Sequence, residues 1–247
     1  HYAVSIPASF ESNQRRDLLD ALSANGIVLS GSNLIDEPNA AFIGYVNPDI
    51  YNKEPIELSE GYNPKVLVFD FGAGTCDISI LEISADYKGY HTKNLSISQF
   101  SELGGNNIDD YIARTYLLPK ILELNNVDKD EYTSKQIDCI VKQLLGVAEL
   151  LKIKICKNFI FLLEDREFLD DALAHNKSTV IDKSIEIYTD YGTLQQDKFS
   201  LSYKNFIDTM NVFFSKDVFS PSRSDKMRRK YNSIYATLDS AISKAHI

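Results

Sequence analysis

The chain has 247 residues, 44% hydrophobic and 25% charged, which is the composition of a folded globular protein large enough to bury a core. Its net charge of −9 and isoelectric point near 5.0 argue against nucleic-acid coating, and no apolar run reaches the ~18 residues of a membrane span. The three cysteines form no CxxC pair, which argues against a disulfide framework and favours a reducing compartment, so we expect a cytoplasmic protein. The four histidines are scattered, so we expect no histidine metal site.

The first part of the chain alternates strands and helices. The predicted elements are a strand at 2–7, a helix at 9–26, a strand at 27–35, a helix from Pro38 onward, and a proline-rich surface connection at 47–64. Ser12 is the expected N-cap of the first helix, and Gly26 is its expected stop.

A glycine turn follows, between apolar runs at 66–71 and 77–83, and this pattern predicts a hairpin with a third strand at 90–100. The remaining predicted elements are helices at 103–122 and 134–156, strands at 159–165 and 183–190 with a loop or short helix at 166–179 between them, and closing helices at 203–219 and 225–246. The order is mixed α and β. It predicts a core at 1–103, an inserted α+β subdomain at 104–199, and helices returning to the core at 200–247.

The turn sequence VLVFDFGAGTCDISILEI carries the chemistry. Asp70 and Asp77 flank the turn residues Gly72, Ala73, Gly74 and Thr75. Backbone amides of such a turn suit an anion, and two carboxylates beside a phosphate require a divalent cation between them. The pattern therefore indicates an Mg²⁺–nucleotide site, while a tight hairpin with solvated aspartates is equally compatible with the spacing. A protein-kinase assignment of DFG fails because no HRDLxxxN motif accompanies it, and there is no P-loop.

Five stretches in order resemble the heat-shock-70 (DnaK-type) chaperone family. They are YAVSIPASFESNQRRDLLDALSANGI, NLIDEPNAAFIGY, the glycine-turn motif itself, SELGGNNIDDYI, and AELLKIKIC at 148–156. The resemblance implies an α/β chain with the actin-like ATPase (ribonuclease-H-like) fold, forming one lobe of a bilobal nucleotide-binding domain. It also implies that the chain is a central piece of that domain, because the family's first phosphate loop and catalytic lysine have no counterpart here. We therefore expect the isolated chain to be inactive.

The resemblance also implies roles for individual residues. Glu37, Asp70 and Thr75 would act in catalysis, and Asp70 and Asp77 would hold Mg²⁺ through water. The implied nucleotide contacts are the turn residues Gly72, Ala73, Gly74 and Thr75 on the phosphates, and Glu149, Lys152, Ile153 and Cys156 on the adenosine side. Pro7 and Arg15 match residues that couple nucleotide state to a peptide-binding domain.

Three positions depart from the family pattern. Ala73 replaces a glycine, which is tolerable only where φ is negative. Cys156 replaces a serine and is a weaker hydrogen-bond partner, whereas Cys76 is expected to be a buried packing residue.

Three functions stay open. The first is an ATPase that hydrolyses ATP to drive a protein-folding cycle, with ATP/ADP and Mg²⁺ as cofactors. A J-domain co-chaperone, a nucleotide-exchange factor and unfolded peptide would be its partners, with no nucleic acid and no membrane. The second is a regulatory or adaptor module that binds nucleotide with little hydrolysis. The third, a sugar- or acetate-kinase relative, is disfavoured by the EPNAA and LGG stretches.

Overall fold

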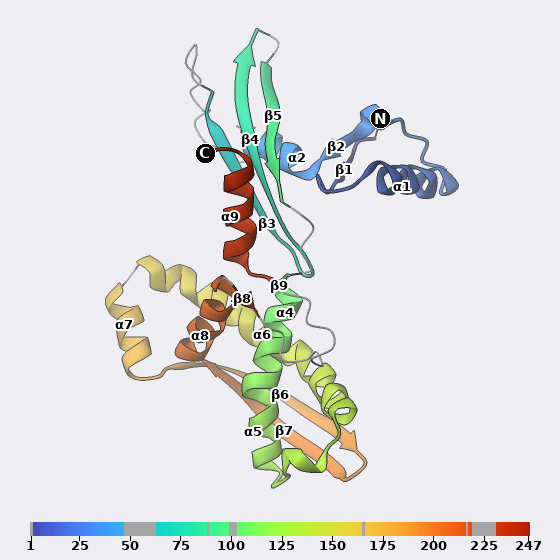
Figure 1. The fold of residues 1–247 in the computed structure, drawn as a ribbon. Helices are drawn as coiled ribbons and strands as arrows, with labels where there is room; N and C mark the ends of the chain where they lie inside the picture. Colours follow the sequence, from blue (N-terminus) through green and yellow to red (C-terminus); the bar gives the residue numbers. More distant parts are fainter. Residues whose placement is uncertain are drawn as a thin grey trace. The chain divides into compact units, whose positions relative to one another are not determined.

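The computed structural model describes residues 2–46, 63–87, 89–98, 103–164, 166–215, 217–218 and 231–247. Contacts within the chain divide it into two units, His1–Glu102 with Ala236–Ile247, and Leu103–Tyr235 (Figure 1). The predicted roles of 1–103, 104–199 and 200–247 as core, insertion and closing helices stay predictions. In the described part of the chain, no helix is both long and apolar enough to cross a membrane.

The first unit is built on an antiparallel sheet. Its strands are β3 (Lys65–Phe71), β4 (Cys76–Asp86) and β5 (Gly89–Ile97), in the order β3-β4-β5. A short parallel pair, β1 (Val4–Ile6) and β2 (Leu34–Asp36), lies in the same unit. The predicted hairpin around the glycine turn is confirmed, and so is the third strand.

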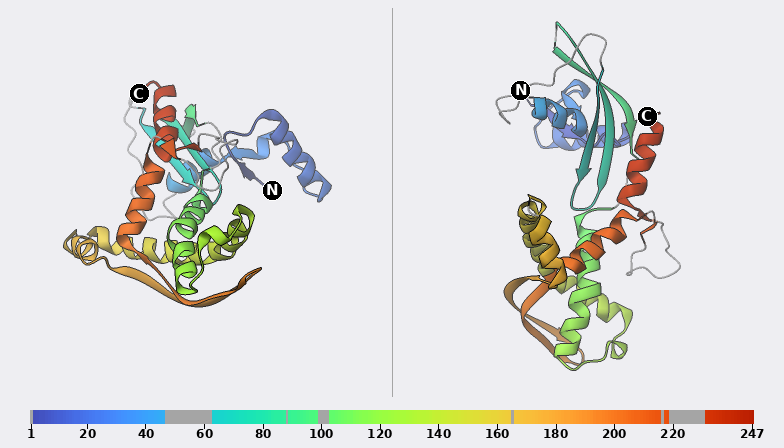
Figure 2. Two further views of the ribbon diagram at one scale, coloured as in Figure 1. Left: turned by 60° about the horizontal axis from the view of Figure 1, so that its bottom comes forward. Right: turned by 90° about the vertical axis from the view of Figure 1, so that its left-hand side faces the viewer.

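Helices cover both faces of this sheet, because the central strand β4 is apolar on each side. On one face Ile78 and Ile80 are buried against Ala241 of α9 (Ile234–Lys244). On the other face Leu81 packs with Phe42 of α2 (Glu37–Val46). The two views of Figure 2 show α9 and α2 on opposite sides of the strands. The unit is therefore a three-layer α/β/α arrangement.

Local hydrogen bonding sets the elements near the N-terminus. The N-cap of helix α1 (Ser12–Ala24) lies one residue earlier than predicted, because it is Glu11 rather than Ser12, and the Glu11 N–H donates to Gln14 Oε1 at 2.9 Å. Gly26 follows the helix with φ of 80°, as a helix stop requires. The strand predicted at 27–35 is wrong over most of its length. The Ser30 N–H donates to the side-chain oxygen Oδ1 of Asn33, three residues later, at 3.1 Å. A 3₁₀ turn at Gly31–Asn33 therefore takes the place of hydrogen bonding to a neighbouring strand.

The second unit combines helices with a long hairpin. In chain order its elements are α4 (Gly105–Ile112), a π-helical turn (Ala113–Leu117), α5 (Leu118–Leu124), a 3₁₀ turn (Lys129–Glu131), α6 (Ser134–Glu164), α7 (Arg166–Ala174), β6 (Ser178–Thr189), β7 (Gly192–Ser202), α8 (Tyr203–Phe214), β8 (Asp217–Val218) and β9 (Tyr231–Asn232). Helix α6 packs against α4 and the hairpin β6–β7. Its side chains Leu144, Leu151 and Ile155 are fully buried and form much of the core.

Two predictions for this unit are wrong. The apolar run at 159–165 continues α6 as far as Glu164 instead of forming a strand, because no glycine or proline stands between Cys156 and this run. Strand β7 was not expected, because its centre is polar, although it pairs with β6 along its whole length. The closing helices are shorter than predicted, and residues 219–230 and 47–62 lie outside the described part.

Candidate functional site

The register of β3 and β4 places the two aspartates of the motif side by side. Asp70 and Asp77 are cross-strand partners, and Phe71 pairs with Cys76 next to them. The turn is closed by a hydrogen bond of 2.9 Å from the Gly72 N–H to the Thr75 carbonyl oxygen. Directly opposed residues in an antiparallel pair have Cβ atoms about 4.5–5.5 Å apart. The two carboxylates therefore leave the sheet at one point, at the base of the turn.

The glycines of this turn are not needed for a left-handed backbone conformation. None of Gly72, Ala73 and Gly74 has a positive φ, so a side chain is compatible with the backbone at each of them. The prediction that Ala73 avoids positive φ is thus confirmed. A Cβ built on Gly74 would meet nothing within 4 Å, so the missing side chain leaves open space over the backbone. Such a bare turn is accessible to an anion.

A third carboxylate reaches the same place from another element. Glu37 opens α2, directly after β2, and lines a pocket of about 160 Å³ together with Asp70 and Asp77. The first turn of a helix favours a negative charge, which explains an acid at this position. Val68 and Phe69 of β3 also line the pocket and add apolar surface to it. The structure therefore brings Glu37, Asp70 and Asp77 together.

The pocket carries uncompensated negative charge. Burial and the charges of Asp70 and Asp77 raise the pKa of Glu37. Burial also raises the pKa of Asp77, against hydrogen bonds from Ser9 and Thr75 that lower it. Nearby like charges disfavour ionisation, and a bound cation would relieve this cost. In the described ranges no three His, Cys, Asp or Glu side chains converge to ligate an ion directly. Carboxylates suit Mg²⁺, which keeps several of its waters and takes one or two carboxylate ligands.

Ser9 is a site residue that the sequence did not reveal. Its hydroxyl donates to Asp77 Oδ1 at 3.4 Å, from the turn that follows β1. Pro7 accepts the Phe10 N–H in that turn at 3.0 Å, and Arg15 Nε donates to the Phe10 carbonyl oxygen at 2.9 Å. Pro7 and Arg15 are therefore brought to one turn, which also contacts the carboxylate pair. The stretch IPASF at residues 6–10 marked the turn but gave no sign of the hydroxyl contact.

Arg15 also makes an ion pair on its other side. Its guanidinium bonds to Asp36 Oδ1 at 2.8 Å, and Asp36 is the residue before Glu37. Both side chains are partly shielded from solvent. Arg15 thus ties α1 to the strand end that carries the third carboxylate.

Cys76 lies behind the site as an inert packing residue, as predicted. It is fully buried against α9, and burial together with the charge of Asp77 raises the pKa of its thiol to about 11. A thiol held neutral in this way is a poor nucleophile.

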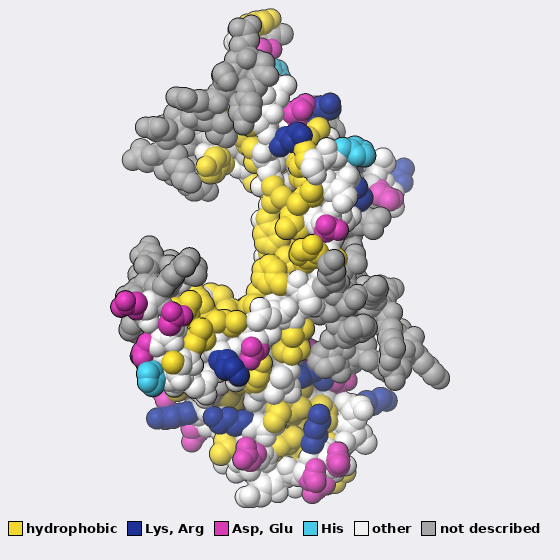
Figure 3. Space-filling model, turned by 60° about the vertical axis from the view of Figure 1, so that its left-hand side comes forward, with side chains coloured by type: hydrophobic (Ala, Val, Ile, Leu, Met, Phe, Trp, Pro, Cys, Tyr) yellow, Lys and Arg dark blue, Asp and Glu magenta, His cyan; other side chains and the backbone are white. Residues whose placement is uncertain are grey.

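Figure 3 shows hydrophobic side chains gathered on the sheet-bearing unit, on the side of β3 and α9. Leu67 and Phe69 of β3 are 43% and 46% exposed, and Ile242 of α9 is 36% exposed. The Phe69 ring stacks parallel to that of Phe71. These exposed apolar side chains lie on the α9 side of the sheet, whereas Glu37 reaches Asp70 and Asp77 from the α2 side.

The adenosine-side residues predicted from the resemblance belong to the second unit. Glu149, Lys152, Ile153 and Cys156 follow one another at helical spacing on one face of α6. Glu149, Ile153 and Cys156 are exposed, as ligand contacts require. Lys152 differs, because its side chain is only 17% exposed and already has partners. Burial raises the pKa of the Cys156 thiol, so this group is a neutral, weak hydrogen-bond partner.

Comparison with known proteins gives a consistent result. The family described as "Hsp70 protein" matches residues 1–164. A chaperone protein dnaK3 of Synechocystis sp. is 32% identical over 152 residues, which is 62% of this chain and 17% of that protein. A chaperone protein DnaK of Thermoplasma volcanium is 36% identical over 152 residues, 62% of this chain and 21% of its own length. One from Mycoplasma mycoides is 30% identical over 164 residues, 65% of this chain and 25% of that protein. The chain thus spans about a fifth of the length of these relatives.

Proposed function

The chain belongs to the Hsp70 family, and on that premise we propose that the native protein carrying it binds Mg²⁺–nucleotide and hydrolyses ATP to drive a peptide-binding, protein-folding cycle. Membership confirms the resemblance seen in the sequence and implies nucleotide binding on an actin-like ATPase fold. The mixed α/β architecture is consistent with that fold.

One observation carries the proposal. Three carboxylates from separate elements, Glu37, Asp70 and Asp77, line a single pocket beside a bare glycine turn. Burial and the nearby charges of Asp70 and Asp77 raise the pKa of Glu37, so its ionised form is costly in a protein that binds nothing there. A magnesium–phosphate ligand removes that cost and uses the turn amides as well.

The residues then take distinct roles. Asp70 and Asp77 would hold Mg²⁺ through its water ligands, and the ion would supply charge neutralisation on the phosphates. The amides of Ala73 and Gly74 would donate to phosphate oxygens, while Gly72, whose N–H is held by the Thr75 carbonyl oxygen, would keep the turn in shape. Glu37 and Asp70 would accept hydrogen bonds from the water that attacks the γ-phosphorus, and the bond to the β-phosphate oxygen would break. Catalysis of this kind rests on positioning and charge stabilisation.

Thr75 has a more local part in this proposal. A hydrogen bond from Thr75 lowers the pKa of Asp77 and so favours its ionised form. The single hydroxyl hydrogen of Thr75 would hold the metal carboxylate in place without ligand and would turn to a phosphate oxygen when nucleotide binds.

The remaining assignments concern the second unit and the whole protein. Glu149, Ile153 and Cys156 would face adenosine, and Pro7 and Arg15 would transmit the state of the pocket to a peptide-binding domain. We further propose that the first unit is one lobe of a bilobal domain and the second an inserted subdomain. The proposed partners are a J-domain co-chaperone, a nucleotide-exchange factor and unfolded peptide, in the reducing cytoplasm.

The test is a comparison of turnover with affinity in the native protein. Asp70→Asn and Glu37→Gln should each lower kcat at least tenfold while Mg-ADP affinity changes by less than threefold, because placement of metal and water acts mostly in the transition state. Wild-type turnover in either variant at saturating Mg²⁺ would contradict the assigned roles.

The same measurement tests the adaptor alternative. Tight Mg-ADP binding by the wild-type protein without measurable hydrolysis would replace the ATPase by a nucleotide-binding regulatory module.

A further inference from the structure

The carboxylate of Asp77 is held by a residue of another element. The Ser9 hydroxyl donates to Asp77 Oδ1 at 3.4 Å, although the two residues are 68 positions apart in the sequence. Ser9 follows β1, whereas Asp77 belongs to β4, and the preceding residue Ala8 lines the same pocket as Asp77. Ser9 and Asp77 are both partly shielded from solvent. Ser9 is therefore the contact through which the turn after β1 reaches the proposed magnesium site.

The turn that carries Ser9 is held by hydrogen bonds of its own. The Phe10 N–H donates to the Pro7 carbonyl oxygen at 3.0 Å and closes the turn. Arg15 Nε donates to the Phe10 carbonyl oxygen at 2.9 Å, and the Arg15 guanidinium also bonds to Asp36 Oδ1 at 2.8 Å. The backbone thus places the Ser9 hydroxyl beside Asp77 before any ligand binds.

Asp77 has a second hydroxyl donor, which the proposed ligand would take away. Thr75 also hydrogen-bonds to the Asp77 side chain. A hydroxyl group has one hydrogen to donate. When Thr75 turns this hydrogen to a phosphate oxygen, as in the proposed function, Asp77 keeps the hydrogen bond from Ser9. Ser9 then holds Asp77 while Thr75 serves the phosphate.

A donor on one oxygen of Asp77 orients the whole carboxylate. A carboxylate offers about four acceptor sites, so the Ser9 bond to Oδ1 leaves acceptor sites for the water ligands of a cation. Mg²⁺ demands near-ideal octahedral geometry and keeps several waters, so it gains from a carboxylate that is already placed. Loss of the Ser9 bond should therefore weaken binding only where the metal takes part.

We propose that Ser9 is a positioning residue of the magnesium site, which holds Asp77 in the orientation that the water ligands of Mg²⁺ require. The inference rests on the proposed Mg²⁺–nucleotide binding and deepens it. It adds to the site a residue that the sequence did not single out. Ser9 would touch neither the metal nor the nucleotide, so its effect should pass entirely through Asp77.

Calorimetry of ADP with Mg²⁺ and in EDTA tests this role in the native protein. Ser9→Ala should weaken Mg-ADP binding about fivefold, or ~1 kcal/mol, and leave ADP binding in EDTA unchanged. The expected loss is moderate because 3.4 Å is long for an O–H···O hydrogen bond. Ser9→Thr keeps a hydroxyl group and should stay within twofold of the wild type. Ser9→Cys, a weaker donor of similar shape, takes the place of Ser9→Ala if the latter does not fold.

A double-mutant cycle with Asp77→Asn shows whether Ser9 acts through Asp77. In the Asp77→Asn background, Ser9→Ala should cause no further loss of Mg-ADP affinity. In steady-state hydrolysis, Ser9→Ala alone should raise the Mg²⁺ concentration for half-maximal rate about fivefold. At saturating Mg²⁺, kcat should return to within twofold of the wild type, because the metal compensates for a misplaced carboxylate but not for a general loss of packing.

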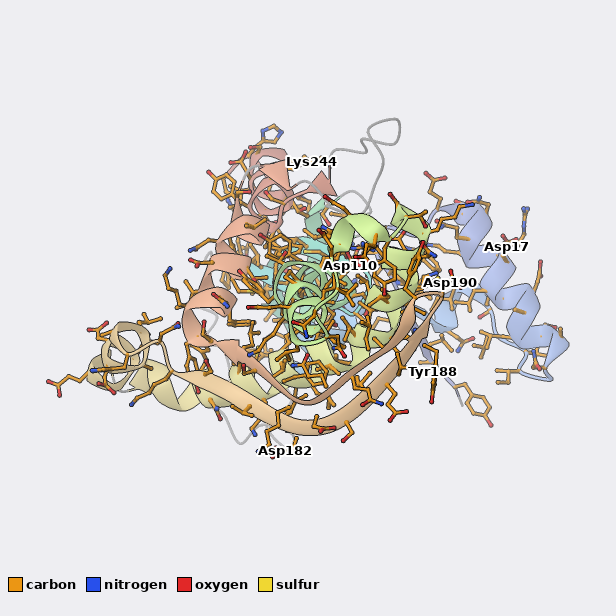
Figure 4. The ribbon with its side chains drawn as sticks, turned by 90° about the horizontal axis from the view of Figure 1, so that it is seen from below. Asp17, Asp110, Asp182, Tyr188, Asp190 and Lys244 are labelled. Atoms are coloured by element: carbon orange, nitrogen blue, oxygen red, sulfur yellow. The ribbon has the colours of Figure 1, made fainter. Side chains whose placement is uncertain are left out.

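Two exposed residues of the same unit serve as matched controls. Ser5 lies in β1, and Ser5→Ala makes the same chemical change as Ser9→Ala at an exposed position. Asp17, labelled in Figure 4, lies on α1, the helix that also carries Arg15. Asp17→Asn removes a carboxylate charge as Asp77→Asn does, but Asp17 does not line the pocket. Both control variants should bind Mg-ADP as the wild type does.

Three results would overturn the inference. They are unchanged Mg-ADP affinity in Ser9→Ala, an equal loss of ADP affinity with Mg²⁺ and in EDTA, and additive losses in the double variant. Weaker Mg-ADP binding in Ser5→Ala, equal to that in Ser9→Ala, would also contradict it. Failure of the wild-type protein to bind Mg-ADP would instead overturn the proposed function from which the inference starts.

Discussion

Replacing Gly74 by alanine separates the ligand role of the turn from its role in folding. Gly74 has no left-handed φ, and a Cβ placed on it would meet nothing within 4 Å. The added methyl group therefore causes neither strain nor a clash. Alanine also restricts the unfolded chain, so Gly74→Ala should raise the free energy of unfolding by about 0.4–1 kcal/mol.

The same Gly74→Ala substitution should weaken nucleotide binding although it stabilises the fold. The methyl group would occupy the open space over the turn and keep a phosphate from the backbone amides. Loss of one hydrogen bond to a charged group costs about 1.5–3 kcal/mol, which is a roughly 10- to 100-fold weaker Mg-ADP affinity. Calorimetry measures the affinity, and thermal unfolding without nucleotide measures the stability.

Gly26 is the control for this prediction. It has φ of 80° in the turn after α1, so Gly26→Ala should lower stability by about 1–2 kcal/mol without changing nucleotide affinity. If Gly74→Ala bound Mg-ADP as tightly as the wild type, the phosphates would not approach this turn, and the proposed site would be wrong.

Three further predictions follow from the same unit. Ala73→Gly should leave Mg-ADP affinity within threefold and lower stability by about 0.4–1 kcal/mol, because Ala73 already has a compatible φ; a tenfold tighter affinity would show that the methyl group obstructs phosphate. Glu37→Gln should raise the thermal midpoint at pH 7 and have no effect below about pH 4, because a raised pKa makes the ionised Glu37 destabilising and its protonated form neutral; an equal difference at both pH values would refute this cause. Ile78→Ala should cost about 2–5 kcal/mol in denaturant unfolding, because Ile78 is fully buried under α9; a loss below 1 kcal/mol would mean that α9 does not cover this face.

Sequence patterns predicted the hairpin well, because its signals are local. Two apolar runs separated by a glycine turn define both strands, and their pairing places Asp70 opposite Asp77. The end of α6 and strand β7 were harder to predict. The apolar residues before Glu164 suit a helix or a buried strand equally, and β7 has a polar centre that alternates only weakly.

The site was predictable only where its residues share a motif. Glu37, Asp70 and Asp77 each lie in a stretch that resembles the family, and the structure lines one pocket with them. Ser9 was missed because its partner, Asp77, is far away in the sequence. A contact between residues so far apart depends on tertiary packing, and a single sequence gives no local sign of it.

Helix α9, which packs on one face of the sheet of the first unit, is synthesised long after the strands of that sheet. Strand β5 ends at Ile97, but the part of α9 that packs on Cys76, Ile78 and Ile80 comes after the whole of Leu103–Tyr235. At about 5–20 residues per second a ribosome needs on the order of ten seconds for that interval. Throughout it, the nascent strands lack the α9 cover over an apolar face. An insertion into the second unit lengthens this exposure, and a stop codon before Ala236 makes it permanent, which turns a truncated product into an aggregation hazard.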